Sequence, residues 1–166
     1  NHFLNKEGVS ITNIKKKNDN FHARFSAKMR IYKYIIINRL SRPVIDKNRG
    51  WHIIKELDID IMKKGAKKLM GTKDFSTFRA SSCRAKSPIK TFKFIKIKSL
   101  KNKIEIEFQS QSFLQKQVRS MVGCLKYLGE KKWTIKKFEN VIKLKKRTLC
   151  APPAPSEGLY LVRVLY

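Results

Sequence analysis

Acidic residues are scarce in this chain of 166 residues, since 12 Asp and Glu stand against 39 Lys and Arg. The formal net charge at pH 7 is therefore +27. Such an imbalance favours a polyanionic partner, because neutralising phosphates releases counterions and drives sequence-independent affinity for nucleic acid. An AT-rich coding sequence, which enriches Lys, Ile and Asn, is the alternative origin of the charge, although it does not explain why acids are so few. Composition alone does not separate RNA from DNA.

Cysteine and histidine are also few, with three of each. Cys83, Cys124 and Cys150 lie far apart and form no CxxC pair, and the histidines form no HxxxH pair. These spacings argue against a zinc site, so we expect no metal. Widely separated cysteines also fit a reducing compartment.

Long apolar runs and glycine-rich loops are missing as well. The apolar runs are far too short to cross a bilayer, so we expect no membrane partner. The 7 glycines form no phosphate-binding loop, and no internal repeat is visible.

The length and the 42% hydrophobic content predict one domain over residues 1–166 with a real core. Residues 1–22 have no strong periodicity. Because the sequence opens on Asn1 rather than Met, we expect residues 1–22 to be a connection from an N-terminal half that is not in view. Any targeting signal would lie upstream.

Periodicity predicts an α+β fold with a mostly antiparallel mixed sheet and helices packed on one face. In the first helix Asp58 is the expected N-cap, and Gly71 closes the helix. The order is strand, helix, two strands, two helices and strand, with expected ranges Phe25–Asn38, 58–70, Thr91–Ser99, Lys103–Ser110, Ser112–Leu128, Ile135–Leu144 and Leu159–Leu165.

Two pairs of side chains on these strands have both a structural and a functional interpretation. Tyr32 and Tyr34 share a strand face, where they either pack in the core or form a stacking platform for a base. Glu105 and Glu107 also share a face and could be paired catalytic carboxylates. Salt pairing with lysines across the expected hairpin explains them more simply.

The loop over residues 74–90 mixes aromatic, hydroxyl and basic side chains. This composition suits contact with a phosphate backbone, and it suits a solvated connector equally well.

Arginine is the minority basic residue, 10 against 29 lysines, and Arg119 lies within the expected helix Ser112–Leu128. A guanidinium holds a carboxylate or phosphate through two parallel hydrogen bonds, whereas lysine offers only a point charge. We therefore expect Arg119 to lean over the core and hold an anionic partner in a cleft. Gly123 in the same helix allows close approach by another backbone. The apolar stripe that Arg119 borders consists of Leu114, Val118, Met121, Leu125 and Leu128.

Several stretches, in the same order along the chain, resemble the C-terminal half of the TruA-type tRNA pseudouridine synthases. Each motif alone is weak, but together they cover nearly the whole chain. They are FHARFSA at 21–27, YKY at 32–34 with its strand, GTKDFSTFRA at 71–80, KSP at 86–88, FL at 113–114 leading to VR at 118–119 and VG at 122–123, and APSEGLYLV at 154–162.

The resemblance implies an RNA isomerase that converts uridine to pseudouridine in the anticodon stem-loop of tRNA. It implies a cytoplasmic homodimer that uses no cofactor. In this family an aspartate of an Arg-Thr-Asp motif attacks the nucleoside, and the freed uracil rotates and rejoins the sugar through C5 after leaving the stack. No aspartate of this chain stands in that context. We therefore expect the nucleophile upstream and the fragment alone to be inactive.

Position within these motifs implies catalytic roles for two residues. Tyr32 matches the tyrosine expected to stack on the flipped base and to take the C5 proton. Arg119 matches the arginine that pairs with the catalytic aspartate and keeps it ionised. Leu159 and Leu161 match the apolar lining of the substrate pocket.

Three further basic residues, Arg24, Arg79 and Lys86, are candidates for contact with RNA phosphates. The chain departs from the family pattern around Arg119 and immediately before Tyr32. These departures bear on the detailed contacts to RNA rather than on the reaction class. The departing residues are Ile31, Gln115, Lys116 and Ser120.

Two other functions compete with the enzyme. A non-catalytic RNA-binding module of the same fold would keep the basic surface without the chemistry. A basic ribosome-associated protein would explain the charge but not the ordered motifs.

Overall fold

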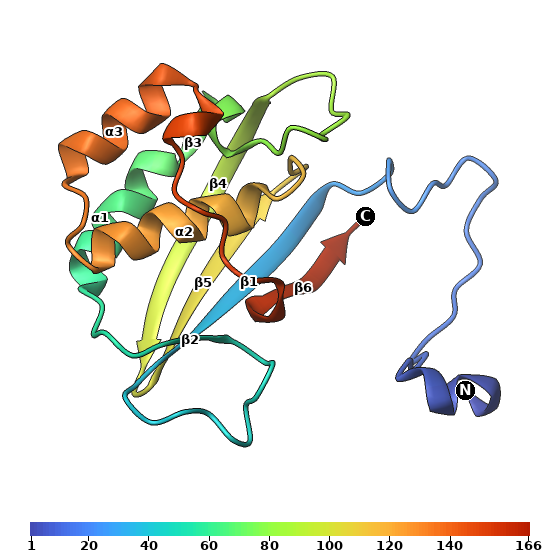
Figure 1. The fold of residues 1–166 in the computed structure, drawn as a ribbon. Helices are drawn as coiled ribbons and strands as arrows, with labels where there is room; N and C mark the ends of the chain where they lie inside the picture. Colours follow the sequence, from blue (N-terminus) through green and yellow to red (C-terminus); the bar gives the residue numbers. More distant parts are fainter.

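The computed structural model describes residues 1–166, and a six-stranded mixed sheet forms its centre (Figure 1). The middle strand, β1, pairs antiparallel with β5 on one side. On its other side β1 pairs antiparallel with β6 and, further along, parallel with β2. β4 and β3 extend the sheet beyond β5, both antiparallel. The strands are β1 (Met29–Asn38), β2 (Trp51–Ile53), β3 (Gly71–Asp74), β4 (Ile89–Leu100), β5 (Lys103–Ser110) and β6 (Leu159–Leu165).

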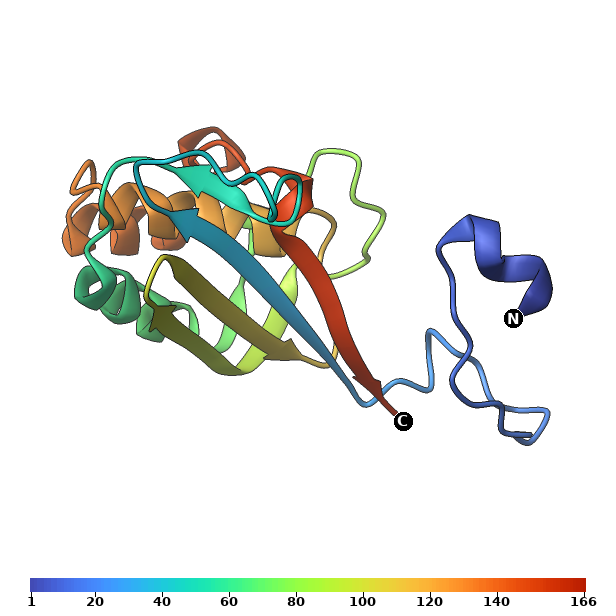
Figure 2. The same cartoon turned by 90° about the horizontal axis from the view of Figure 1, so that it is seen from below.

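Three helices cover one face of the sheet: α1 (Ile59–Leu69), α2 (Gln117–Gly129) and α3 (Ile135–Leu144) (Figure 2). Large aromatic and aliphatic side chains fill the space between these layers, because alternate strand residues point to the helices. The most deeply buried of them include Tyr34, Phe75, Phe78, Phe92, Phe108, Ile106, Met62, Leu69 and Phe138. None of the helices combines the length and the apolar character that crossing a bilayer requires.

The predicted α+β class, with a mostly antiparallel mixed sheet and helices on one face, is confirmed. Asp58 caps α1 as expected, since its carboxylate accepts a hydrogen bond from Ile61 N–H at 3.0 Å. Gly71 follows the helix with a φ of +88°, a left-handed conformation that glycine adopts without strain. β2 and β3 were not predicted, because strands of three and four residues carry too little alternation to detect.

The first strand starts later than predicted, at Met29 rather than Phe25. Residues 22–26 form a turn instead, in which Ser26 N–H donates to His22 O at 2.8 Å. Residues 1–22 lie apart from the sheet and include a short 3-10 turn, His2–Glu7, with no buried residue (Figure 1). Their role as a connection, and the assignment of residues 1–166 to one domain, remain predictions.

The predicted helix Ser112–Leu128 is wrong at its beginning, because α2 starts only at Gln117. Lys116 adopts a left-handed conformation with φ 59°, which separates the helix from the residues before it. Leu114 is nevertheless buried, because Leu114 and Gln117 bind each other in a tight turn. Because this turn buries Leu114 at helical spacing from Val118, the sequence pattern continues as if the helix began earlier.

Glu105 forms a cross-strand ion pair, with its carboxylate 2.9 Å from Lys33 Nζ. The lysine comes from β1 rather than from the hairpin partner β4. Glu107 accepts a hydrogen bond from the Gln109 side chain at 2.7 Å. Salt pairing across strands therefore accounts for Glu105, although not with a lysine of the hairpin as predicted.

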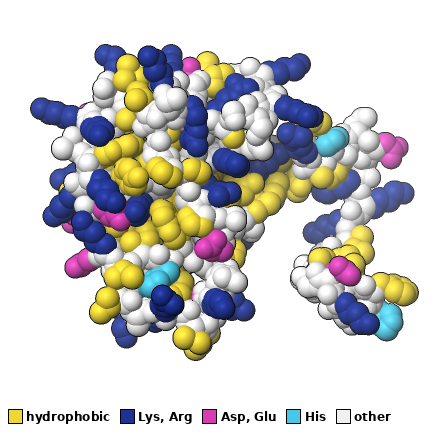
Figure 3. All heavy atoms as spheres, viewed as in Figure 1, with side chains coloured by type: hydrophobic (Ala, Val, Ile, Leu, Met, Phe, Trp, Pro, Cys, Tyr) yellow, Lys and Arg dark blue, Asp and Glu magenta, His cyan; other side chains and the backbone are white.

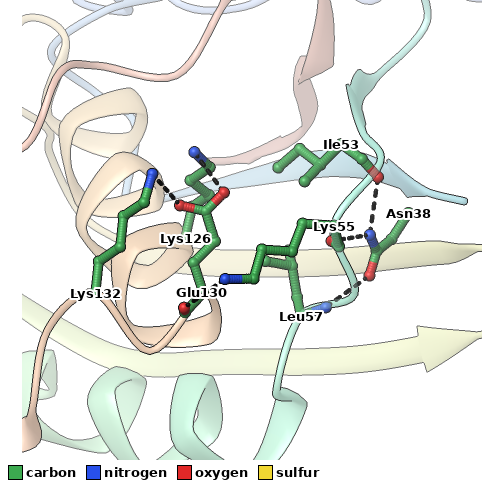
Figure 4. Close-up of polar contacts among 7 residues, drawn as sticks. All are labelled: Asn38, Ile53, Lys55, Leu57, Lys126, Glu130 and Lys132. Atoms are coloured by element: carbon green, nitrogen blue, oxygen red, sulfur yellow. Dashed lines mark hydrogen bonds and ion pairs between the residues drawn. The ribbon is translucent and has the colours of Figure 1, made fainter. Parts of the chain in front are cut away.

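A polar cluster around the buried Glu130 fixes the C-terminal end of α2 (Figure 4). The Glu130 carboxylate lies between Lys126 Nζ at 2.7 Å and Lys132 Nζ at 3.0 Å. Lys55 Nζ donates to the main-chain oxygen of Glu130 at 3.2 Å. Lys55 belongs to the connection between β2 and α1, which Asn38 of β1 also binds. The Asn38 amide donates to the main-chain oxygens of Ile53 and Lys55 and accepts from Leu57 N–H. The cluster ties the sheet, α1 and α2 together.

Candidate active site

A cavity of about 730 Å³ opens where β1 and β6 meet the N-terminal end of α2. Its wall comes from four parts of the chain: residue 24, residues 32 and 159 of the sheet, the loop 82–85, and residues 113–119. Four of the side chains in this wall are basic and none is acidic. Lys and Arg also far outnumber Asp and Glu over the visible surface (Figure 3). The cavity therefore favours an anionic ligand.

The two tyrosines of β1 have different surroundings. Tyr34 is fully buried, and its hydroxyl donates to Pro155 O at 2.7 Å. Burial, with a contribution from the nearby Glu157 carboxylate, raises the pKa of Tyr34 well above its ordinary value. Tyr32 instead lines the cavity, with its ring edge-on to Phe113 at 4.9 Å between ring centroids. The core interpretation thus fits Tyr34, and only Tyr32 can meet a ligand in this cavity.

Arg119 also lines the cavity, as the third residue of α2. Its Nε donates to Ala154 O at 2.6 Å, while Ala154 N–H donates to Arg119 O at 2.9 Å. No other hydrogen bond or ion pair within the chain uses the guanidinium. The group is therefore fastened at one nitrogen, which leaves its two terminal nitrogens free for a planar anion.

Gly123 explains how the loop over residues 150–155 comes so close to α2. A Cβ added at Gly123 would lie 2.1 Å from Pro152 O. Any larger residue would push this loop, and with it the carbonyl of Ala154 that orients Arg119, away from the helix. The predicted close approach of another backbone at Gly123 is confirmed.

Leu159 and Leu161 stand beside Tyr34 and Tyr32 in the β1–β6 register. Leu159 is half-buried and belongs to the cavity wall. Leu161 is 54% exposed and lies outside the wall. Of the two leucines expected to line the pocket, the structure brings only Leu159 to this cavity.

The three basic residues expected to contact phosphates occupy different positions. Arg24 is exposed and belongs to the cavity wall. Lys86 is exposed in the loop just beyond the wall. Arg79 is turned to the protein instead, since one terminal nitrogen donates to Cys83 O at 2.7 Å and Ala85 O at 2.8 Å. Arg79 therefore shapes the loop 82–85 that forms part of the wall.

Sequence reasoning assigned no role to several residues of the wall, among them Phe113, Arg84 and Cys83. Burial acts to raise the pKa of the Cys83 thiol, but main-chain N–H groups of Ala85 and Gln115 and the Arg79 guanidinium outweigh it and lower the pKa. Only the scarcity of arginine could have singled out Arg84. No three side chains of Cys, His, Asp or Glu come together to hold a metal ion.

Comparison with known proteins agrees with the resemblance seen in the motifs. The family model described as tRNA pseudouridine synthase matches residues 66–166. The tRNA pseudouridine synthase A of Pelagibacter ubique is 70% identical over 166 residues, which is all of this chain and 68% of that protein. The protein of the same name from Caulobacter vibrioides is 42% identical over 166 residues and 67% of its own length. That of Parvibaculum lavamentivorans is 44% identical over 158 residues, 95% of this chain and 64% of the relative.

The motifs around Tyr32 and Arg119 thus lie in a chain of which 95% or more aligns with each of these relatives. A match of this identity and extent is not a likeness of fold alone. The chain belongs to the tRNA pseudouridine synthase family.

Proposed function

We propose that this chain is the C-terminal part of a tRNA pseudouridine synthase that isomerises uridine to pseudouridine in the anticodon stem-loop. The observation that carries the proposal is the cavity that Tyr32 and Arg119 both line and that no carboxylate lines. An enzyme of this family needs an aspartate there. The remaining part of the enzyme would supply it, and these 166 residues alone would be inactive.

Arg119 would hold that aspartate. Its Nε is bound to Ala154 O, so the guanidinium plane is fixed before any partner arrives. Its two terminal nitrogens would then take both oxygens of the carboxylate. Such a pair favours the ionised carboxylate, which is the nucleophilic form, and aims it at the nucleoside.

Tyr32 would receive the flipped base. Its ring lies edge-on to Phe113, and Phe113 and Leu159 line the same cavity, so the wall would give the base an apolar surface to stack on. Once uracil has rejoined the sugar, the tyrosine oxygen would accept the proton from C5 and release its own proton to water. A cavity of about 730 Å³ has room for one nucleotide.

The net charge of +27 supports tRNA as the partner, with Arg24 and Lys86 as contacts to its phosphates. A homodimer and a cytoplasmic location rest on the family resemblance alone. Light scattering on a full-length protein tests the first, and a mass of one chain would refute it.

A full-length chimera tests the proposed function. This chain would replace the matched 68% of the Pelagibacter ubique relative, whose 70% identity favours a compatible join. We expect pseudouridine in tRNA incubated with the chimera, read by carbodiimide labelling and primer extension, with the unaltered relative as the positive control. Tight tRNA binding without pseudouridine would instead favour the non-catalytic RNA-binding module.

A further inference from the structure

The N-terminal end of α2 has unused hydrogen-bond donors. Lys116 at the N-cap position makes no side-chain capping bond, and the first turn holds no acidic residue. The main-chain N–H groups of Lys116, Val118 and Arg119 take part in no hydrogen bond within the protein. A helix of 13 residues concentrates partial positive charge at this end. The unused donors lie in the wall of the cavity that holds Tyr32.

Gln117 adds a second, independent donor at the same place. Its side chain is 0% exposed and lies in the wall of the cavity. Its Oε1 accepts a hydrogen bond from Leu114 N–H at 2.8 Å, which fixes the orientation of the amide. Its NH₂ group has no partner. An unpaired buried donor is uncommon and costly in a folded protein, so it indicates a missing acceptor.

The loop over residues 82–85 adds positive charge to the same cavity. Arg84 lies in the loop 82–85, and Gln115 fastens this loop to the beginning of α2. Gln115 accepts from Ser82 Oγ at 3.1 Å through its side chain, and its own N–H donates to Cys83 Sγ at 3.4 Å. The guanidinium of Arg84 is therefore carried by a loop that is attached to the helix end.

We propose that Arg84, Lys116, Gln117 and the free N–H groups of α2 bind one backbone phosphodiester of the substrate RNA, next to the uridine received by Tyr32. The subsite offers donors from several directions, which suits the two non-bridging oxygens of a phosphodiester. Arg119 offers a planar fork, which suits a carboxylate. The inference rests on the proposed function, because it needs RNA in this cavity.

Coupling between one lysine and one phosphate tests the subsite. In the chimera, Lys116→Gln would be combined with RNA hairpins that carry a neutral methylphosphonate at one position at a time around the target uridine. We expect one position to weaken binding by about 10-fold in the unaltered chimera, the size typical of a charge-assisted hydrogen bond. That loss should shrink to about 3-fold in Lys116→Gln, because the charged contact of this lysine is gone while the other donors of the subsite remain.

Lys131→Gln is the matched control. Lys131 follows the other end of α2 and has nearly the same left-handed backbone, with φ 58° against 59° for Lys116. In this variant the methylphosphonate loss should remain at about 10-fold, as in the unaltered chimera. Arg84→Gln, measured in the same way, provides a second test should Lys116→Gln fold poorly.

The outcomes separate the subsite from the proposed function. Equal methylphosphonate losses in Lys116→Gln, Arg84→Gln and the unaltered chimera would overturn the phosphate subsite and point to a protein carboxylate as the acceptor. An active chimera with that result keeps the proposed function. A chimera that forms no pseudouridine refutes the proposed function, whereas the coupling in RNA binding can still be measured.

Discussion

The two ends of α2 have similar backbone conformations but differ in how their polar groups are bound. Each is flanked by a lysine in the left-handed conformation, Lys116 before the helix and Lys131 after it. At the C-terminal end Lys131 N–H donates to Leu128 O at 2.9 Å, and Glu130 lies between two lysines. At the N-terminal end three main-chain N–H groups have no acceptor. One end stabilises the fold, and the other keeps binding capacity at a cost in stability, as is common at functional sites.

The largest effect is expected at the N-terminal end, from Arg119→Lys in the full-length chimera. Lysine keeps the charge but loses the planar fork, so single-turnover pseudouridine formation should fall by about 100-fold or more. Removing the catalytic aspartate should cost far more. Arg163→Lys is the matched control, because Arg163 is exposed in β6 and its side chain makes no hydrogen bond or ion pair. An unchanged single-turnover rate in Arg119→Lys would rule out the pairing role.

Gly123→Ala, in the middle of α2, should lower both the stability of the fold and the activity. The added Cβ would come within 2.1 Å of Pro152 O, so the loop over residues 150–155 must move. We expect a loss of about 1–3 kcal/mol in the free energy of urea unfolding, together with slower isomerisation because Arg119 loses its fixed orientation. In Gly8→Ala nothing lies within 4 Å of the added Cβ, and the left-handed backbone at φ +64° belongs to the segment that lies apart from the sheet, so the unfolding of the core should be unchanged. A stable and fully active Gly123→Ala variant would contradict this account.

Glu130→Gln, at the C-terminal end of α2, should lower the stability of the fold and leave the rate of isomerisation unchanged. Removing the charge between Lys126 and Lys132 should lower the free energy of unfolding at pH 7 by about 1–2 kcal/mol. Burial acts to raise the pKa of Glu130, but its hydrogen bonds from these lysines outweigh it and hold the pKa below the ordinary 4.5. The carboxylate therefore stabilises the fold above pH 4.5, and its contribution is lost as pH falls through the lower folded value.

The stability of Glu130→Gln and of the unaltered protein should accordingly converge in acid. Glu139→Gln is the control, because the exposed pair of Glu139 with Lys68 is worth less. Urea unfolding at pH 7 and pH 3 measures both variants. A constant difference across that range would assign the effect to packing rather than charge.

The smallest effect concerns the left-handed lysines themselves. Asparagine tolerates positive φ better than lysine, so Lys116→Asn and Lys131→Asn should each stabilise the fold by about 0.5 kcal/mol. Only Lys116→Asn should also weaken RNA binding and lower the salt dependence of binding by about one counterion. Equal RNA affinities for the two variants would erase the functional difference between the ends of α2.

The sequence predicted the parts of the fold that carry strong periodicity. The hairpin of β4 and β5, the helices α1 and α3 and the final strand appeared where alternation or helical spacing placed them. β2 and β3 were not predicted, because edge strands of three or four residues contain too little alternation of apolar and polar residues. The beginning of α2 was predicted too early because Leu114, in the turn before the helix, is buried at a position that fits the hydrophobic periodicity of the helix.

The candidate site divides in the same way. Arg119 stood out by its residue type, and Tyr32 by the motifs around it. Their shared cavity could not be predicted, since it depends on β1, β6 and α2 meeting over long sequence separations. Arg79 shows the limit most clearly: its basic character suggested a phosphate contact, yet its guanidinium is bound to two carbonyls of its own loop.

By itself the sequence determined the family, the class of fold and the excess of positive charge, and it singled out Arg119 as a candidate for binding an anion. These properties follow from residue identity and short-range order, which a linear chain already contains. The tertiary structure alone decided that Tyr34 is core while Tyr32 faces the cavity, that Leu161 lies outside it, and that one end of α2 has free donors. Those differences depend on which groups are buried and already hydrogen-bonded, and only the packed chain sets that.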